Sequence, residues 1–285
     1  MILASLFIFG AISGSFVVAS VWRIRADQLV AEKQHKNVDY NRLVKQNKLA
    51  GVNPSKDHSR CLSCGYKLRW FDLVPVFSWL FLRGRCRKCR QPIGLLELST
   101  EVALGLFFAL SYVLWPLEVS GWFGAAAFGL WISWLITAAI LFIYDLKWME
   151  LPVNVLYLSI ALSFLFACAV CLIGGFSATK VIEHLLAIMI LAGVYGFLYW
   201  VSKGRWVGSG DAFVGASLAL MLGDWRLAFL TLFLANLIGS LVVLPSLTSK
   251  KITFSSRVPM GPLLIVAGIL VFWFGQDMLD YFNFL

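Results

Sequence analysis

Long apolar runs separated by short polar stretches dominate the chain. A helix that crosses the hydrocarbon of a bilayer needs about 20 mainly apolar residues, and eight runs are candidates. They are Ile2–Trp22, Ser99–Leu117, Trp122–Tyr144, Val153–Ile173, Val181–Val201, Asp211–Leu222, Leu227–Leu247 and Gly261–Phe282. The sixth is short and begins with an aspartate, so it is expected to face protein or water rather than lipid. The pattern predicts an all-α polytopic integral membrane protein with about eight transmembrane helices.

Composition agrees with this fold class. Hydrophobic residues make up 60% of the chain, charged residues 14%, and the mean hydropathy is +0.82. Soluble globular proteins contain about 45–50% apolar and about 25% charged residues, so the composition argues against a soluble enzyme. In the first run the basic residues follow the apolar segment. A cleaved signal peptide would have them in front, so a retained first span with its N-terminus outside is expected.

The positive charges predict the orientation. Sixteen of the 24 Lys and Arg lie between Arg23 and Arg90, and most others follow the third, fifth and seventh runs. The positive-inside rule places these loops in the cytoplasm and both termini outside. This distribution explains the net charge of +9 without a nucleic-acid partner. It also indicates that the large basic loop lies against anionic membrane lipid.

The long polar stretch, residues 23–98, is predicted to form a small cytoplasmic domain. From Asp27 to Ser59 we expect either a helical extension of the first span followed by a loop, or a partly disordered segment. Two Cys-x-x-Cys pairs follow, with 21 residues between them: Cys61, Cys64, Cys86 and Cys89. This pattern is typical of a closed four-cysteine zinc site with a structural role. Disulfides and unligated cysteines are the alternatives, and a reducing cytosol disfavours the former.

An aromatic stretch, Trp70–Phe81, lies between the two cysteine pairs. It is too short to span a bilayer, and Pro75 interrupts it. Two interpretations stay open: the stretch lies in the membrane interface, or it forms a small core packed on the zinc knuckles. The remaining cysteines, Cys168 and Cys171, are expected to act as small apolar side chains within the fourth span.

Two aspartates are the candidates for chemistry. Asp145 ends the third span and Asp211 opens the sixth, after Gly208-Ser209-Gly210. Two complete spans separate them, so both should lie near the cytoplasmic surface at similar depth. Two carboxyl groups held close share one proton, and such a pair can activate water and protonate an oxyanion, as in an aspartic protease. The glycines are expected to permit positive φ or close approach of another backbone.

At this point the sequence resembles the prepilin peptidases, from Gly14 to the last span. Gly14-Ser15-Phe16 followed by Arg23 resembles the first-helix motif, and the cysteine pairs resemble the zinc-knuckle loop. Asp145 with Glu150-Leu151-Pro152, Gly208-x-Gly210-Asp211 and Val258-Pro259-Met260-Gly261-Pro262 resemble further motifs of that family. The chain departs from the family pattern at Val18 and Phe213.

The resemblance implies an aspartic endopeptidase of the bacterial cytoplasmic (inner) membrane. It would remove the leader peptides of type IV prepilins and type II secretion pseudopilins at the cytoplasmic face. N-methylation of the new N-terminus with S-adenosylmethionine would follow. Asp145 and Asp211 carry over as catalytic residues, and the four knuckle cysteines as zinc ligands. The domains would then be helix 1–22, cytoplasmic zinc domain 23–98 and catalytic bundle 99–285.

Methyl transfer needs a site for a sulfonium, which carboxylates and aromatic faces stabilise. The predicted cofactor-binding residues are Gly14 and Glu101, with Asp72 and the aromatic stretch beside them. A plain helix-end charge is the alternative for Glu101.

Two other functions remain possible from the residues alone. A proton- or cation-coupled transporter could use the two membrane aspartates, although a transporter should show inverted repeats. A zinc-bearing scaffold would leave the aspartates without a role.

Overall fold

The computed structural model describes residues 1–36, 59–61, 63–117, 121–248 and 258–283. Over these residues the fold is helical, with isolated β-bridges at Arg60–Lys67 and Arg85–Pro92. The chain divides into two compact units, Met1–Val113 and Leu114–Leu285. Residues 37–58, which make up most of the stretch Asp27–Ser59, lie outside the described residues.

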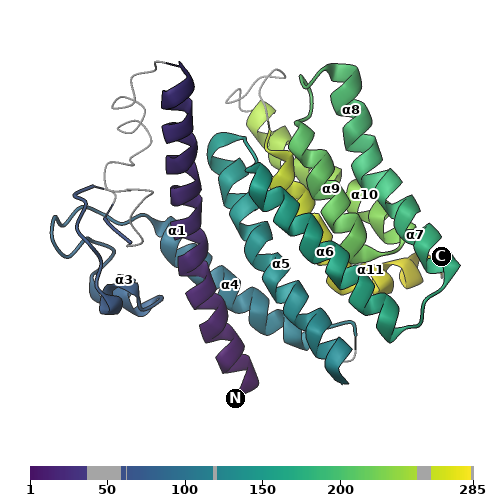
Figure 1. The fold of residues 1–285 in the computed structure, drawn as a ribbon, viewed down its shortest axis with the longest axis horizontal. Helices are drawn as coiled ribbons and strands as arrows, with labels where there is room; N and C mark the ends of the chain where they lie inside the picture. The colour runs from purple at the N-terminus through teal and green to yellow at the C-terminus, as the bar shows by residue number, and fades with distance from the viewer. Residues whose placement is uncertain (37–58, 62, 118–120, 249–257, 284–285) are drawn as a thin grey trace. The chain divides into compact units, whose positions relative to one another are not determined.

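Unit 1 consists of two long helices and the cysteine-bearing segment between them (Figure 1). Helix α1 spans Ile2–Lys36 and α4 spans Leu95–Val113, and the short η1 (Trp70–Leu73) and α3 (Phe77–Phe81) lie between them in the chain. The predicted helical extension beyond Trp22 is therefore confirmed as far as Lys36. Because α1 and α4 pack closely, both belong to one compact unit. The domain boundaries at residues 22 and 98 stay a prediction.

Glycines bring α1 and α4 together. A side chain at Gly10 would clash with the carbonyl oxygen of Leu104, and one at Gly14 would meet the Cα of Glu101 at 2.6 Å. Residue numbers rise along α1 as they fall along α4, so the two helices run antiparallel. Small residues at such an interface are typical of helices that pack within membranes, where close backbone approach replaces the hydrophobic driving force.

Unit 2 is a helical bundle whose elements agree with the predicted spans. They are α5 (Gly121–Trp148), α6 (Val153–Ile173), α7 (Ala178–Ile188), the π-helical turn η2 (Met189–Gly193), α8 (Val194–Ser202), α9 (Ser209–Leu222), α10 (Trp225–Thr248) and α11 (Met260–Asn283). The fourth predicted span coincides with α6, and the fifth is one continuous path through α7, η2 and α8.

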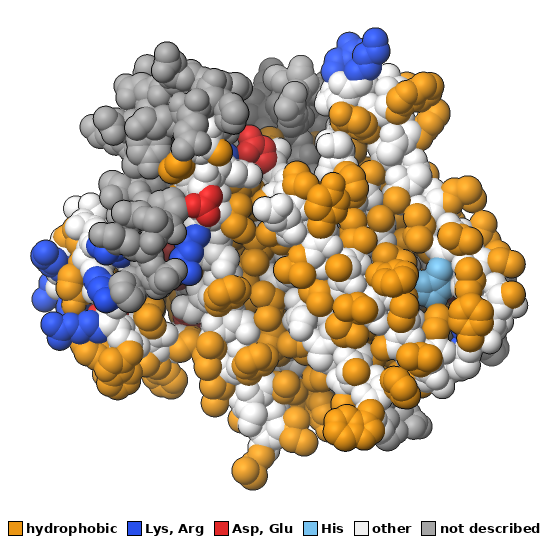
Figure 2. All heavy atoms as spheres, viewed as in Figure 1, with side chains coloured by type: hydrophobic (Ala, Val, Ile, Leu, Met, Phe, Trp, Pro, Cys, Tyr) orange, Lys and Arg blue, Asp and Glu red, His pale blue; other side chains and the backbone are white. Residues whose placement is uncertain are grey.

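Among the described residues, seven helical segments are long and apolar enough to cross a membrane, and the 14-residue α9 is a shorter apolar helix. Seven of the eight predicted spans are therefore present, and the sixth is a short apolar helix, as expected. Apolar side chains cover much of the visible helical surface (Figure 2). Such a surface suits lipid and confirms an integral membrane protein.

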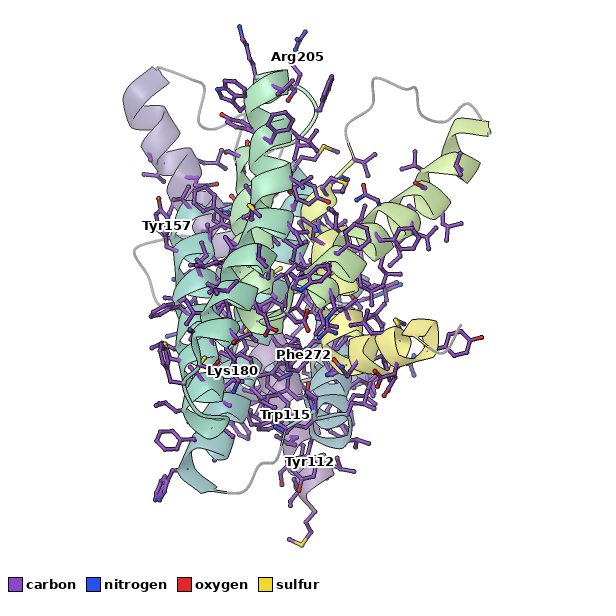
Figure 3. The ribbon with its side chains drawn as sticks, turned by 90° about the vertical axis from the view of Figure 1, so that its right-hand side faces the viewer. Tyr112, Trp115, Tyr157, Lys180, Arg205 and Phe272 are labelled. Carbon is purple, nitrogen blue, oxygen red and sulfur yellow. The ribbon has the colours of Figure 1, made fainter. Side chains whose placement is uncertain are left out.

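An aromatic cluster fills one end of unit 2. The Trp115 ring lies 5.7 Å from that of Phe272, and Trp131 stacks on Phe272 at 3.9 Å between ring centroids. Figure 3 shows Trp115 and Phe272 together, with Arg205 at the far end of the bundle. The cluster ties α5 and α11 to the segment that precedes α5, since large rings supply much buried area.

Candidate active site and metal centre

The two predicted catalytic aspartates lie at the same end of unit 2. Asp145 is in the last turn of α5, and Asp211 is in the first turn of α9. Between them the chain crosses the bundle twice, through α6 and then through α7, η2 and α8. Both side chains are buried, at 6% and 7% exposure. A buried carboxyl group in an apolar bundle is costly unless it is hydrogen-bonded or functional.

Each carboxyl group accepts one backbone hydrogen bond. The Gly261 N–H donates to Asp145 Oδ2 at 3.2 Å, and the Gly208 N–H donates to Asp211 Oδ2 at 3.1 Å. Within the described part of the chain, the Oδ1 atoms have no protein partner, and no Lys or Arg pairs with either aspartate. The two Oδ1 atoms are therefore available to water or a substrate.

Asp145 and Asp211 lie near enough to each other to interact electrostatically. Two acidic groups so placed do not both ionise readily and tend to share one proton. The arrangement then offers one proton acceptor and one proton donor at the same place, which is what hydrolysis of an amide requires.

The glycines near the aspartates work through close packing. A side chain at Gly210 would meet Leu151 Cδ1 at 2.6 Å, and one at Gly261 would meet Asp145 Oδ2 at 2.9 Å. Gly208 has φ −75°, and neither it nor Gly210 is left-handed. Of the two uses predicted for Gly208 and Gly210, positive φ is therefore wrong. The close neighbour of Gly210 is the Leu151 side chain, so the approach of another backbone stays a prediction.

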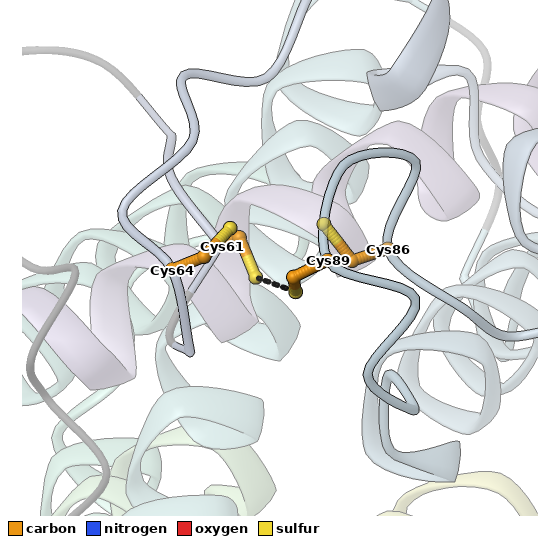
Figure 4. Close-up of side chains that lie close together, drawn as sticks. All are labelled: Cys61, Cys64, Cys86 and Cys89. Atoms are coloured by element: carbon orange, nitrogen blue, oxygen red, sulfur yellow. Dashed lines mark hydrogen bonds between the residues drawn. The ribbon is translucent and has the colours of Figure 1, made fainter.

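The four predicted zinc ligands come together in unit 1. The sulfur atoms of Cys61, Cys64, Cys86 and Cys89 all lie within 4.8 Å of one another, and Cys61 Sγ is 3.9 Å from Cys89 Sγ (Figure 4). Four sulfurs around one zinc at about 2.3 Å would lie about 3.8 Å apart. The cluster can therefore hold a metal after a small contraction, and four thiols fit a soft or borderline ion such as zinc.

The two knuckles share one backbone pattern. The Gly65 N–H donates to the Cys61 carbonyl at 2.9 Å, and the Arg90 N–H donates to the Cys86 carbonyl at 3.0 Å. Gly65 and Arg90 occupy equivalent positions, with φ of +68° and +58°. Each turn therefore points both sulfurs of a pair to one side, and the two turns face each other.

The thiols in this cluster titrate unequally. Burial raises the pKa of Cys61 to about 12. Burial also acts on Cys86, but the backbone N–H groups of Cys89 and Lys88 outweigh it and lower the pKa of Cys86 to about 7. Backbone donors aimed at the sulfurs stabilise thiolates, the form that binds a metal.

The predicted cofactor residues Gly14 and Glu101 meet at the α1–α4 interface. The buried Glu101 carboxylate accepts the Val76 N–H at 2.7 Å and also hydrogen-bonds Ser15. Asp72 accepts the Arg87 guanidinium at 2.9 Å. Both carboxylates predicted to face a sulfonium thus have protein partners. Binding of S-adenosylmethionine at Gly14 and Glu101 stays a prediction, and we derive no methyl-transfer step from these residues.

Unit 2 contains a buried hydroxyl cluster that the apolar pattern does not predict. Ser217 Oγ accepts the Trp134 indole N–H at 2.8 Å and lies 2.9 Å from Ser159 Oγ and 2.8 Å from Ser163 Oγ. It joins α5, α6 and α9, the helices that carry and separate the two aspartates. The serines inside otherwise apolar spans are the feature of the sequence that could have indicated this cluster, because polar side chains there usually bond to a neighbouring helix.

Fold and site together define a polytopic membrane protein with two neighbouring buried carboxyl groups and a cluster of four cysteines that could hold a metal. The chain belongs to the prepilin leader peptidase/N-methyltransferase family of enzymes. Residues 8–115 match the family described as Bacterial Peptidase A24 N-terminal domain. No solved structure matches the chain.

Three curated relatives named "Prepilin leader peptidase/N-methyltransferase" illustrate the similarity. The protein of Stutzerimonas stutzeri is 27% identical, over 97% of this chain and 92% of the relative. The protein of Aeromonas hydrophila is 30% identical, over 80% and 76%. That of Burkholderia pseudomallei (strain 1026b) is 31% identical, over 79% and 70%.

Proposed function

We propose that this protein is an aspartic endopeptidase that removes the leader peptide of type IV prepilins and type II secretion pseudopilins. The observation that carries the proposal is the placement of Asp145 and Asp211 at one end of unit 2, buried, near each other and each with one free oxygen. The names of the relatives supply prepilins as the substrate, and pseudopilins are implied by the family resemblance. They favour the peptidase over the transporter hypothesis.

The proposed reaction uses the pair as one acid and one base. The ionised aspartate takes a proton from water as the water oxygen attacks the scissile carbonyl. The protonated aspartate donates its proton to the carbonyl oxygen, which gives a neutral tetrahedral intermediate. On collapse, the aspartate that took the proton from water gives it to the leaving nitrogen, and the other aspartate takes a proton from one hydroxyl group of the intermediate. The C–N bond breaks, and a carboxylic acid and an amine form. The pair regains its single shared proton.

The proposed setting is the inner membrane, with the aspartates and the basic knuckle segment at its cytoplasmic face. The distribution of Lys and Arg supports this orientation. A basic leader peptide and S-adenosylmethionine are both available there. Methylation of the newly formed N-terminal amine is the second proposed step, and it rests on the N-methyltransferase part of the relatives' names.

The proposed metal in the four-cysteine centre is zinc in a closed, structural site. Four thiolates leave zinc no open position for water or substrate. The metal would fix the two knuckles against each other, and the carboxyl pair in unit 2 would carry out hydrolysis without it.

The deciding experiment incubates the detergent-purified full chain with a prepilin and reads the mass of the product. Loss of the leader mass reports cleavage, and a further gain of one CH₂ group with S-adenosylmethionine reports methylation. A prepilin of unchanged mass after incubation with folded protein would refute the proposed peptidase. Cleavage without the CH₂ gain would refute the methylation step alone.

A further inference from the structure

We propose that the exposed edge of η1 and α3, together with the basic second knuckle, is a surface that docks into the headgroup layer of an anionic lipid leaflet. Its apolar members are Trp70, Phe77, Leu80 and Phe81, and its basic members are Arg83, Arg85, Arg87, Lys88 and Arg90. We call this set the docking edge. It goes beyond the proposed cleavage and methylation, and it does not depend on either.

The apolar members of the docking edge do not form a core. Trp70 is 79% exposed, Phe77 63%, Leu80 55% and Phe81 86%. Trp79, in the same stretch, packs against Gly84. The contact is so close that a side chain at Gly84 would lie 2.7 Å from the Trp79 ring. The core interpretation of the aromatic stretch therefore holds for Trp79, and the four exposed side chains need another environment.

A hydrogen bond fixes the depth of this segment along the membrane helices of unit 1. The Val76 N–H, between η1 and α3, donates to Glu101 Oε2 at 2.7 Å. Glu101 lies six residues inside the candidate span Leu95–Val113, which is about 9 Å along the helix axis. The turn thus lies alongside the second turn of α4 and not beyond its end.

Helix α1 gives an independent measure of the same depth. Ser15 hydrogen-bonds Glu101, and the first charged residue of α1 is Arg23, eight residues further on. The separation is about 12 Å along the axis. Headgroup layers are about 5–8 Å thick on each side of the hydrocarbon. Both helices therefore place Val76 at or just below the headgroup layer.

The backbone at Val76 indicates that this position is held firmly. Val76 has φ +62° and ψ −52°, a conformation that a β-branched residue adopts only when its surroundings impose it. The buried Glu101 carboxylate supplies that constraint. The exposed aromatic side chains on both sides of Val76 are thereby held at the level where tryptophan and phenylalanine are favoured.

Charge identifies the kind of lipid. All five basic members of the docking edge are exposed, and Figure 2 shows Lys and Arg side chains gathered where the cysteine-bearing segment lies. Arg87 also pairs with Asp72. An apolar insertion flanked by several basic side chains is the combination that binds anionic surfaces. Phosphatidylglycerol supplies such a headgroup.

The test uses the full chain in vesicles of phosphatidylcholine alone or with phosphatidylglycerol. The photo-crosslinking residue benzoylphenylalanine replaces Phe81, and in a positive control it replaces Leu106 on α4, which is 50% exposed. Lipid adducts are read by mass spectrometry. The proposal expects adducts at position 81 that rise several-fold with phosphatidylglycerol. Lys88→Glu should reduce that rise, and the matched variant Lys203→Glu should not.

Three results would overturn the proposal. The first is the absence of lipid adducts at position 81 while position 106 reacts. The second is adducts at position 81 that join two copies of the chain, which would make the edge a protein interface. The third is an equal yield of lipid adducts with and without phosphatidylglycerol, which would show that the edge does not recognise an anionic headgroup. None of these readouts uses prepilin cleavage, so they are independent of the proposed function.

Discussion

At the scale of single residues, the site depends on oxygen atoms that buried backbone donors leave free. The Gly261 and Gly208 N–H groups occupy Oδ2 of Asp145 and Asp211. These bonds orient each carboxyl group, because an oxygen that accepts a fixed donor cannot rotate freely. The remaining Oδ1 atoms supply the proposed base and acid.

Replacing either aspartate tests this arrangement. Asp145→Asn and Asp211→Asn preserve the shape of the side chain but remove the carboxyl group that gives or takes a proton, so cleavage should fall by about 100- to 10,000-fold. The measurement is the initial rate of leader removal by the purified variants. Asp224→Asn is the control, since Asp224 forms an ion pair with the neighbouring Arg226. This variant should cleave the prepilin at the normal rate. A catalytic rate near wild type in either of the first two variants would contradict the assignment.

Gly14 allows α1 and α4 to pack closely because it has no side chain. Gly14→Ala would place a Cβ 2.6 Å from the Cα of Glu101, which forces α1 and α4 apart and should lower the free energy of unfolding by about 1–3 kcal/mol. Thermal unfolding in detergent measures the loss. Gly129→Ala is the matched control, because nothing lies within 4 Å of its added Cβ. Equal stability of the two variants would show that the interface is looser than described.

At the scale of elements, the helices that carry the aspartates are joined by one hydroxyl group. Ser217 on α9 bonds Trp134 on α5 and both Ser159 and Ser163 on α6. In a bundle surrounded by lipid, such bonds fix which faces of the helices meet, because apolar packing alone is similar against lipid and against protein.

Ser217→Ala should therefore disturb both stability and catalysis. We expect a loss of about 1–2 kcal/mol and a reduced turnover rate, because α9 would no longer be fixed relative to α5. Ser13→Ala is the control, since Ser13 is also buried but, among the described residues, bonds only the Phe9 carbonyl of its own helix. An unchanged melting temperature and turnover rate in Ser217→Ala would show that the hydroxyl cluster does not position α9 relative to α5.

The knuckles form the other element whose integrity can be tested. Purified reduced protein should contain about one zinc per chain, measured by elemental analysis. Cys86→Ser should lose the metal and loosen the segment, because a closed thiolate site contributes directly to local folding. Cys168→Ser, in α6, should keep it. Metal-free wild-type protein prepared under reducing conditions would rule out the zinc centre.

At the scale of the whole molecule, the alternation of helices sets which loops share a face. The α6–α7 loop and the α8–α9 loop lie at opposite ends of the helical path α7–η2–α8, as Lys180 and Arg205 show in Figure 3. The positive-inside rule predicts the α8–α9 loop, with the aspartates, on the cytoplasmic face.

Cysteine labelling tests this orientation. A cysteine at Phe176, which is 82% exposed, should react with a membrane-impermeant maleimide in intact cells. One at Trp206, which is 69% exposed, should react only after permeabilisation. The reverse pattern would invert the topology and move the aspartates to the outer face.

The sequence by itself determined the helices and the identity of the candidate sites. Apolar runs must become helices in lipid, because a backbone without water has to satisfy its own hydrogen bonds. Because two complete spans separate Asp145 and Asp211, the chain returns both to the same end of the bundle. The spacing of the cysteines brought four sulfurs together. These signals are local or topological, and they do not require knowledge of packing.

Tertiary structure alone decided what surrounds those residues. Gly261 as the partner of Asp145, Ser217 as the junction of three helices and Glu101 as the acceptor of the Val76 N–H each join residues far apart in the chain. Nothing in the apolar pattern ranks such partners, because any small or polar residue on a helix fits several neighbours. The fate of the aromatic stretch was open for the same reason. It depended on whether Trp70 and Phe81 found a core, and only the packed chain shows that they did not.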